Sequence, residues 1–177
     1  MFRYSFIFIF AWVVFYGVSH AQFKPLKIGY TNIEYLIQLM PDLKIVEKDY
    51  ATYRIQLENK LKEQLTAYEA KVKDYQSKMA TMNDATKKQK EEELLKEQQI
   101  LLKSESQMEE DLLKKNQELM QPLYDKLDKV IKEVAKENDY TYIFNTDAGS
   151  GTTPILLYGP EEFNITDLVK KKLGIAK

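Results

Sequence analysis

Three short runs of the chain contain residue types that could carry chemistry. The run Asp147–Thr153 is rich in Gly, Ser and Thr, but it lacks the Lys-Ser or Lys-Thr ending of a phosphate-binding loop. The acidic runs Glu91–Glu93 and Glu109–Asp111 offer oxygen ligands for a cation. Consecutive residues point in different directions around a helix, so these carboxylates do not converge on one ion. We therefore expect a flexible strand connection at the first run and solvated helix faces at the other two.

Residue types on which many enzymes depend are nearly absent. His20 is the only His, Trp12 is the only Trp, and there is no Cys. Both lie in the first 21 residues, so a chain that loses this segment has neither. The composition excludes His/Cys zinc sites, cysteine nucleophiles and Ser-His pairs. We expect a protein that is not an enzyme and that needs no cofactor or metal.

Residues 1–21 have the pattern of an export signal. Arg3 precedes an apolar run from Phe6 to Val18, and the small residues Ser19 and Ala21 suit a cleavage site before Gln22. An apolar run of about 13 residues is short for a membrane span, which needs about 20. We expect cleavage near Ala21, and the alternative is an uncleaved N-terminal anchor.

Charge is nearly balanced overall but unevenly distributed. Beyond residue 21 there are 25 Lys and Arg against 27 Asp and Glu, which gives no general case for nucleic-acid binding. Residues 71–90, however, contain six lysines and only two aspartates, whereas residues 91–118 contain four lysines and nine acidic residues. The lysines of this basic tip are Lys71, Lys73, Lys78, Lys87, Lys88 and Lys90. The tip could meet anionic lipid or acidic protein segments, and ordinary solubility is the alternative.

Residues 42–138 are predicted to form a helical hairpin. From Leu43 to Met82 apolar residues recur at steps of three or four, which places them on one narrow helix face. Such a stripe suits a two-helix coiled coil. The polar run 83–86 is the expected turn, and the first limb is about 60 Å long at 1.5 Å per residue. Pro122 is expected to kink the second limb.

Irregularities in the stripe predict how the limbs pair. Eleven-residue spacings at Leu57–Tyr68 and Leu119–Val130 suggest that these two stretches face each other. In the second limb apolar residues alternate with Gln98 and Glu105, which predicts a loose middle of the seam between the limbs. Tyr and Met on the arm suit contacts with many unfolded partners, although for any one of them filling the coiled coil is the simpler explanation. The candidate arm residues are Tyr50, Tyr53, Tyr68, Tyr75, Met79, Met82, Leu94, Leu101 and Met108.

The segments 22–41 and 139–177 are predicted to form one small β-rich body. We expect strands at Lys27–Thr31, Tyr140–Asn145 and Ile155–Tyr158. A helix capped by Asn32 should run to Met40, and a last helix should open near Asn164 and end at Gly174. Because these two short segments can form only a marginal core, we expect the body to oligomerise. Its candidate assembly residues are Ile28, Tyr30, Tyr142, Phe144, Ile155 and Leu157.

The order of these elements resembles the Skp/OmpH family of periplasmic chaperones. The resemblance covers Lys27 to Leu173, and its most specific parts are KIGYTNIEYL at Lys27–Leu36, YTYIFNTD at Tyr140–Asp147, LLYG at Leu156–Gly159 and NITDLVKKKL at Asn164–Leu173. It implies an α+β fold in which a long antiparallel coiled-coil hairpin stands on a small β-rich body. Three chains would then form a jellyfish-like homotrimer.

The same resemblance implies a function. Family members hold unfolded outer-membrane β-barrel proteins in a cavity between the arms, without ATP, in the periplasm. A lipopolysaccharide site proposed for the family falls on Lys114 and Lys115. Acidic residues lie nearby, so the assignment of this site to the present chain is weak. The alternative is a structural or adaptor coiled-coil protein of the cell envelope, which residues 1–21 would anchor if they are not cleaved.

Overall fold

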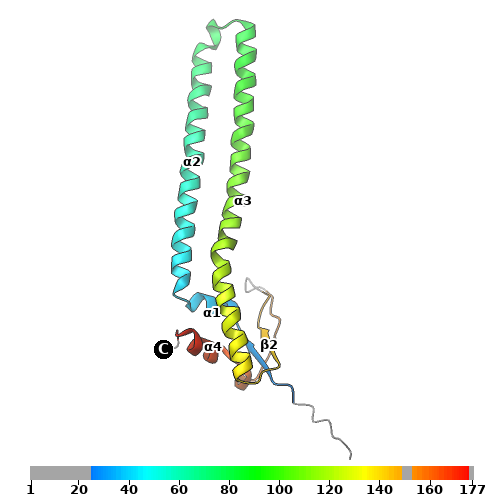
Figure 1. The fold of residues 1–177 in the computed structure, drawn as a ribbon. Helices are drawn as coiled ribbons and strands as arrows, with labels where there is room; N and C mark the ends of the chain where they lie inside the picture. Colours follow the sequence, from blue (N-terminus) through cyan, green and yellow to red (C-terminus); the bar gives the residue numbers. More distant parts are fainter. Residues whose placement is uncertain (1–24, 149–152, 176–177) are drawn as a thin grey trace, which may run out of the picture.

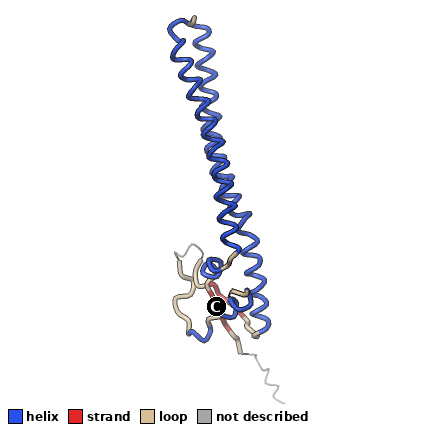
Figure 2. Tube along the Cα trace, turned by 90° about the vertical axis from the view of Figure 1, so that its left-hand side faces the viewer, coloured by secondary structure: helices blue, strands red, loops and turns tan. Residues whose placement is uncertain are grey.

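The computed structural model describes residues 25–148 and 153–175. The expected export signal and the centre of the Gly-rich run lie outside these residues. Figure 1 shows a long two-helix arm rising from a small body, and Figure 2 shows that the arm is narrow in the perpendicular view as well. The expected architecture, a helical hairpin on a small α+β body, is confirmed.

Two long helices make up the arm. Helix α2 spans Asp42–Lys78, the short 3-10 turn η1 spans Met79–Thr81, and helix α3 spans Asp84–Glu137. Asn83 caps α3, because its side-chain oxygen accepts a hydrogen bond from the Thr86 backbone N–H at 2.8 Å. The chain therefore reverses over residues 79–83, slightly before the expected turn at 83–86, and Asp84 to Thr86 already belong to α3. Helix α3 continues through Pro122, which has no N–H to donate to the preceding turn.

The limbs pair in one antiparallel register along the arm. At the root, Lys126 of α3 forms an ion pair with Asp42 of α2 at 2.6 Å. Eleven residues farther along α2 and eleven back along α3, Lys115 lies over the Tyr53 ring at 5.5 Å. Eighteen further residues on each limb lead to the ion pair between Lys71 and Glu97. All three contacts therefore fit one register, without a shift of one helix along the other.

This register corrects two predictions about the seam. Leu57 and Leu61 lie opposite Met108 and not opposite the stretch from Leu119 to Val130, so the two eleven-residue units do not face each other. That later stretch packs against the body, where its apolar spacing is used.

The polar residues of the α3 seam also differ from the expectation. Gln98 and Glu105 are exposed, whereas Glu97, Ser104 and Asp111 are partly buried between Leu94, Leu101 and Met108. The sequence pattern is ambiguous by one residue here, because polar residues occur on both sides of each apolar position. On α2, Leu65 is 41% exposed and Gln64 takes the seam position.

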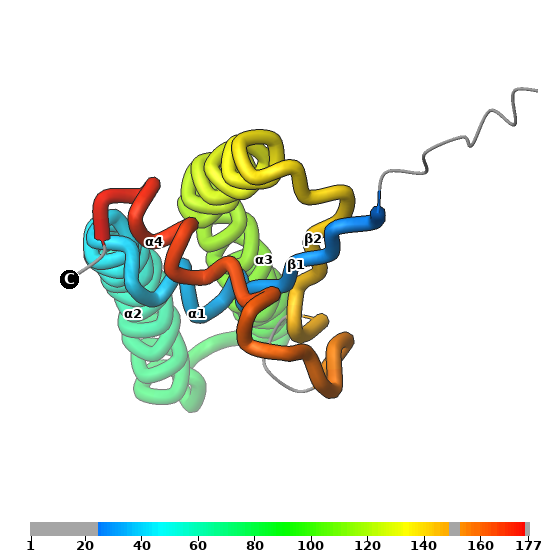
Figure 3. Tube along the Cα trace, turned by 90° about the horizontal axis from the view of Figure 1, so that it is seen from below, coloured from blue at the N-terminus to red at the C-terminus, as the bar shows by residue number. Residues whose placement is uncertain are grey.

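The body contains two paired strands. Strand β1 (Ile28–Thr31) and strand β2 (Tyr142–Asn145) are parallel, with Tyr30 opposite Phe144. The arm lies in the connection between them, and Figure 3, seen from below, shows the two strands side by side next to α3. Helix α1 (Ile33–Leu39), η2 (Glu161–Phe163) and helix α4 (Thr166–Leu173) complete the body. Asn32 caps α1 by accepting from the Tyr35 N–H at 2.8 Å, as expected.

The third predicted strand, Ile155–Tyr158, is wrong. Apart from a bridge between Asp147 and Pro154, this segment pairs with no strand among the described residues. Its Ile155 N–H instead donates to the Thr146 carbonyl at 2.9 Å, and Leu157 is 87% exposed. Strong β propensity is not sufficient for a strand that has no neighbour to pair with. The edge of β1 is occupied by the Asn164 segment, whose Ile165 N–H donates to Tyr30 O at 2.9 Å.

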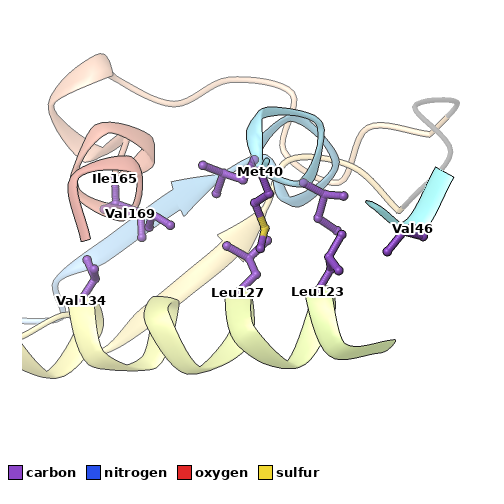
Figure 4. Close-up of a cluster of buried hydrophobic side chains, with 9 residues drawn as sticks. Met40, Val46, Leu123, Leu127, Val134, Ile165 and Val169 are labelled. Carbon is purple, nitrogen blue, oxygen red and sulfur yellow. The ribbon is translucent and has the colours of Figure 1, made fainter. Parts of the chain in front are cut away.

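One apolar core joins the arm root to the body. Leu127 of α3 is 1% exposed and lies beside Met40 at the end of α1, and Val134 of α3 lies near Ile165 and Val169, as Figure 4 shows. Lys172 of α4 adds ion pairs to Glu133 at 3.2 Å and to Glu137 of α3. The other buried members are Leu36, Ile37, Met40, Val46, Leu123, Val134, Ile165 and Val169. Because most of the core lies below the arm, the arm depends on the body for its orientation.

Candidate functional site

The predicted arm residues lie mainly between the limbs. Tyr50, Tyr53, Tyr68 and Tyr75 are partly buried along the α2 side of the seam, with Met82 near the tip. On the α3 side Leu94 and Met108 are partly buried and Leu101 is 8% exposed. Met79, at 45% exposure, is the most exposed residue of the set. In this hairpin these side chains therefore mainly contact the opposite limb.

The space between the limbs near the tip is not completely filled by side chains. A cavity of about 420 Å³ lies there between Tyr75, Met82 and Leu94. The Tyr75 hydroxyl crosses it to donate to Glu91 at 2.6 Å. This hydrogen bond, together with burial of the ring, raises the pKa of Tyr75 above its ordinary value of 10.0. Polar contacts thus replace apolar packing in the outer part of the arm.

Most lysines of the basic tip have local acidic partners. Lys78 pairs with Asp74 at 2.6 Å and Lys90 with Glu93 at 2.6 Å. The Lys90 hydrogen bond lowers the pKa of Glu93, and Gln89 adds a second hydrogen bond. Lys87 lies 4.0 Å from Asp84, and Lys71 pairs with Glu97 across the seam. Among the described residues, Lys73 and Lys88 have no acidic partner, so they carry the most available positive charge of the tip.

Lys114 and Lys115 do not form a single basic surface. Lys115 is partly buried over the Tyr53 ring and lies 3.9 Å from Glu118. Lys114 is exposed, and neighbouring residues point about 100° apart on a helix. An anion on Lys114 would therefore not meet Lys115 without rearrangement of the seam.

The body presents a broad exposed apolar face. Tyr142 and Phe144 of β2 are 55% and 45% exposed, with ring centroids 6.4 Å apart. Ile28 is 44% exposed on β1, and Ile155 and Leu157 are 57% and 87% exposed. These predicted assembly residues lie at the surface in a single chain.

Tyr30 differs from the other predicted assembly residues because it is partly buried. Its hydroxyl donates to the Gly159 carbonyl at 3.1 Å. Burial raises the pKa of Tyr30, and the nearby Glu161 carboxylate raises it further. Tyr30 therefore holds the segment around Gly159 against β1 and supports the apolar face from within.

Three residues of this apolar face were missed from the sequence. Leu26 and Tyr158 are 66% and 82% exposed, and with Phe163 they surround a cavity of about 310 Å³ beside Ile28 and Phe144. Each lies at the end of a predicted element or in a loop, where periodicity gives no signal. Their aromatic or aliphatic type close to a strand is the only indication that the sequence offers.

A second cavity of about 300 Å³ lies at the arm root. It is lined by Ile33 of α1, Tyr124, Leu127 and Ile131 of α3, and Ile143 of β2. The Tyr124 hydroxyl lies 3.4 Å from a Glu34 carboxylate oxygen, and burial raises the pKa of this phenol. Sequence periodicity did not identify this site because it forms where three elements from distant segments meet.

The described residues contain neither a candidate metal cluster nor a candidate membrane-spanning helix. In the part of the chain that the structure describes, no cluster of three or more His, Cys, Asp or Glu could hold a metal ion. Within the same residues, no helix combines the length and apolar character that membrane crossing requires.

Comparison with known proteins identifies the family. No curated protein matches the chain. The crystal structure of a proposed outer-membrane chaperone (OmpH-like) from Caulobacter crescentus CB15 matches with a TM-score of 0.66 at 16% identity, covering 84% of this chain and 83% of that one. At this identity the match shows the fold. The family model described as outer membrane protein (OmpH-like) matches residues 27–173, and the chain therefore belongs to the OmpH-like family.

Proposed function

We propose that this chain is an ATP-independent holding chaperone of the periplasm that binds unfolded outer-membrane β-barrel proteins. Family membership supports a periplasmic chaperone role in general. The observation that carries the finer proposal is an exposed apolar body face at the root of a long projecting arm. A protein with this shape gains an enclosed space only when several copies assemble.

The proposed assembly is a homotrimer joined through the body. Tyr142, Phe144 and Leu157 are large apolar side chains that are 45–87% exposed in the single chain. Exposed apolar surface such as that of the neighbouring Tyr142 and Phe144 rings marks an association site. Burying it between copies would stabilise a body whose own sheet has two strands. Three arms would then surround a cavity open at the tips.

The arms suit weak and exchangeable contacts. Their surfaces mix charged residues with isolated apolar ones such as Ile45, Ile55 and Met79. No single strong site is needed to hold an unfolded chain, because many weak contacts add up when they are linked. Release then follows when the client folds elsewhere, and no nucleotide has to be hydrolysed.

A contact with anionic lipid or lipopolysaccharide is a further part of the proposal. Lys73 and Lys88 at the tip, which lack acidic partners among the described residues, would carry it, and Lys114 would contribute more weakly. Vesicles with and without anionic lipid, at low and raised salt, test this contact. Equal binding to both vesicle types would rule it out.

An aggregation assay tests the central proposal. An unfolded β-barrel protein is diluted from denaturant with no ATP present, and light scattering is followed with and without this protein. Suppression at a few-fold excess of trimer is expected. Unchanged aggregation would contradict the chaperone proposal and favour a structural or adaptor role. Multi-angle light scattering should give three chains, and N-terminal sequencing of the periplasmic protein should begin near Gln22.

A further inference from the structure

Helix α3 carries a second apolar line that the hairpin does not use. Leu95, Leu102 and Leu113 are 56%, 59% and 62% exposed. Steps of seven and eleven residues return to nearly the same side of a helix, within about 20°. The seam residue Leu94 lies about 100° away around the helix. The three leucines therefore point along one face that contacts neither α2 nor the core.

The second line leads into the cavity at the arm root. Tyr124 follows Leu113 by eleven residues and Ile131 follows Tyr124 by seven, so both continue the same face of α3. Both side chains line the 300 Å³ root cavity. From Leu95 to Tyr124 the rise is about 44 Å, which an extended polypeptide covers with about 13 residues. We call this surface, made of Leu95, Leu102, Leu113, Tyr124 and Ile131, the α3 track.

Unpaired carboxylates border the upper part of the α3 track. Glu92, Glu109 and Glu110 are exposed and form no ion pair or side-chain hydrogen bond within the described residues. They lie within about 60° of the line of leucines, whereas Lys103 and Lys114 lie about 80–100° away. Between Leu95 and Leu113 the charged groups nearest to the track are therefore acidic, whereas Lys88 lies on the same side of α3 seven residues before Leu95. An apolar segment that also carries Lys or Arg would satisfy both the leucines and these carboxylates.

Helix α2 has no matching feature. Its exposed Ile45 and Ile55 are ten residues apart, which places them on different sides of the helix, about 80° apart. The asymmetry between the limbs shows that exposed apolar residues are not spread evenly over the arm. It also supplies a matched control, because Ile55 is 52% exposed and Leu102 is 59% exposed.

We propose that the α3 track binds an extended client segment of about a dozen residues whose apolar side chains are flanked by Lys or Arg. This inference rests on the proposed function, because it names the kind of segment that the arm would hold. The upper leucines contact the apolar side chains, the bordering carboxylates contact the basic ones, and the root cavity takes one apolar side chain beside Tyr124.

Three dye-labelled peptides of equal length test this selectivity. Each alternates Leu or Tyr with Ser, and the flanking residues are Lys, Ser or Glu. Fluorescence anisotropy with the purified full-length oligomer should give the tightest binding for the Lys-flanked peptide and the weakest for the Glu-flanked peptide. Raised salt should reduce the difference between them. Equal binding of the three peptides, or tighter binding of the Glu-flanked one, would overturn the inference.

Variants then locate the contact on the track. Leu95→Ser, Leu102→Ser and Leu113→Ser combined should weaken the Lys-flanked peptide about tenfold or more, since three exposed apolar contacts are lost. Ile55→Ser removes similar exposed apolar surface from α2 and should change binding less than twofold. Ser106→Leu fills the gap in the line between Leu102 and Leu113 and should tighten binding severalfold. Loss of binding by Ile55→Ser equal to that of the triple variant would contradict the assignment.

The two proposals fail in different ways. If the triple variant binds peptide as the parent does while both suppress β-barrel aggregation, the track assignment is wrong and the chaperone function stands. If the parent protein suppresses no aggregation yet shows the predicted peptide selectivity, the track is real and its biological role is a different one. Circular dichroism should show unchanged helix content in every variant, because each substituted side chain is exposed.

Discussion

The Tyr30 ring is packed directly against Gly159, which is 129 residues later in the chain. Its hydroxyl donates to the Gly159 carbonyl at 3.1 Å, and a Cβ on Gly159 would lie 2.6 Å from Tyr30 Cε1. Real Cβ atoms essentially never come this close to another heavy atom. The contact joins β1 to the loop that carries Leu157 and Tyr158, and it therefore shapes the apolar body face.

Gly159→Ala should destabilise the protein by about 1–3 kcal/mol, since the new methyl group overlaps the Tyr30 ring. Urea unfolding followed by circular dichroism measures the loss. Combining it with Tyr30→Ala tests the cause, because removing the ring also removes the overlap. The double variant should then lose less stability than the two single losses added together. Strict additivity would mean that Gly159 is needed for some reason other than this contact.

Gly174→Ala isolates a purely conformational cost. Gly174 ends α4 at φ 74°, and nothing lies within 4 Å of its potential Cβ. Alanine should therefore cost about 1–2 kcal/mol through the left-handed backbone alone. Asn tolerates this region better, so Gly174→Asn should cost less than Gly174→Ala in thermal unfolding. A larger cost for Asn would show that a steric contact, absent from the single chain, decides the position.

Leu127→Ala should be among the most destabilising changes in the protein. The side chain is 1% exposed at the centre of the core that joins α3 to the body. Deleting it should cost about 2–5 kcal/mol, whereas Ile55→Ala, at an exposed position of α2, should change stability by less than about 0.5 kcal/mol. Calorimetry compares the two variants. Similar unfolding temperatures would show that the arm root does not depend on this core.

The Tyr75 phenol should titrate later than free tyrosine. Its hydrogen bond to Glu91 retains the proton, so its pKa in the folded protein is raised above 10.0. Below pH 10 the group is protonated in both the folded and the unfolded chain, so its contribution to stability is complete there. That contribution is lost as the pH rises from 10 through the raised folded-state pKa.

Nuclear magnetic resonance of tyrosine labelled at Cζ can follow this titration, with Tyr75→Phe to assign the signal. Glu91→Gln should return the Tyr75 pKa toward 10, because the acceptor then carries no charge. A pKa unchanged by Glu91→Gln would show that burial, and not the carboxylate, causes the shift.

The sequence predicts local features well because local physics determines them. Asn32 caps α1 and Gly174 ends α4, both as expected, and Asn83, expected in the turn, caps α3. The hairpin follows from a helical pattern that is uninterrupted over most of a hundred residues. Each of these features depends on residues that lie within one or two turns of each other.

The errors concern contacts between distant segments. The Ile155–Tyr158 run has the composition of a strand, but the Asn164 segment occupies the edge of β1 instead. The seam predictions failed because the eleven-residue spacing at Leu119–Val130 fits packing against the body as well as packing against α2. Periodicity also does not identify the α3 track, because a spacing pattern does not tell which of two apolar lines on one helix is covered.

A substitution at Ser104 tests whether the seam between the two limbs is loosely packed in its middle. Ser104 occupies a seam position opposite Gln64, beside a small cavity of about 90 Å³ that Leu57 and Leu61 also line. Ser104→Leu should fill this cavity and stabilise the arm by about 1 kcal/mol, because apolar surface replaces a polar group between the limbs. Thermal unfolding followed at the helix signal measures the gain. Ser106→Leu adds the same side chain at an exposed position nearby and should leave stability within about 0.5 kcal/mol of the parent.

The functional consequence of Ser104→Leu follows from the same argument. If the proposed assembly holds clients by arms that separate and close, a tighter seam should slow client capture without changing the oligomeric state. Stopped-flow anisotropy with an unfolded β-barrel protein compares the capture rates of the parent and the variant. A stabilised variant that captures clients as fast as the parent would show that the limbs act as a rigid unit, and that motion in the assembled protein occurs at the arm root.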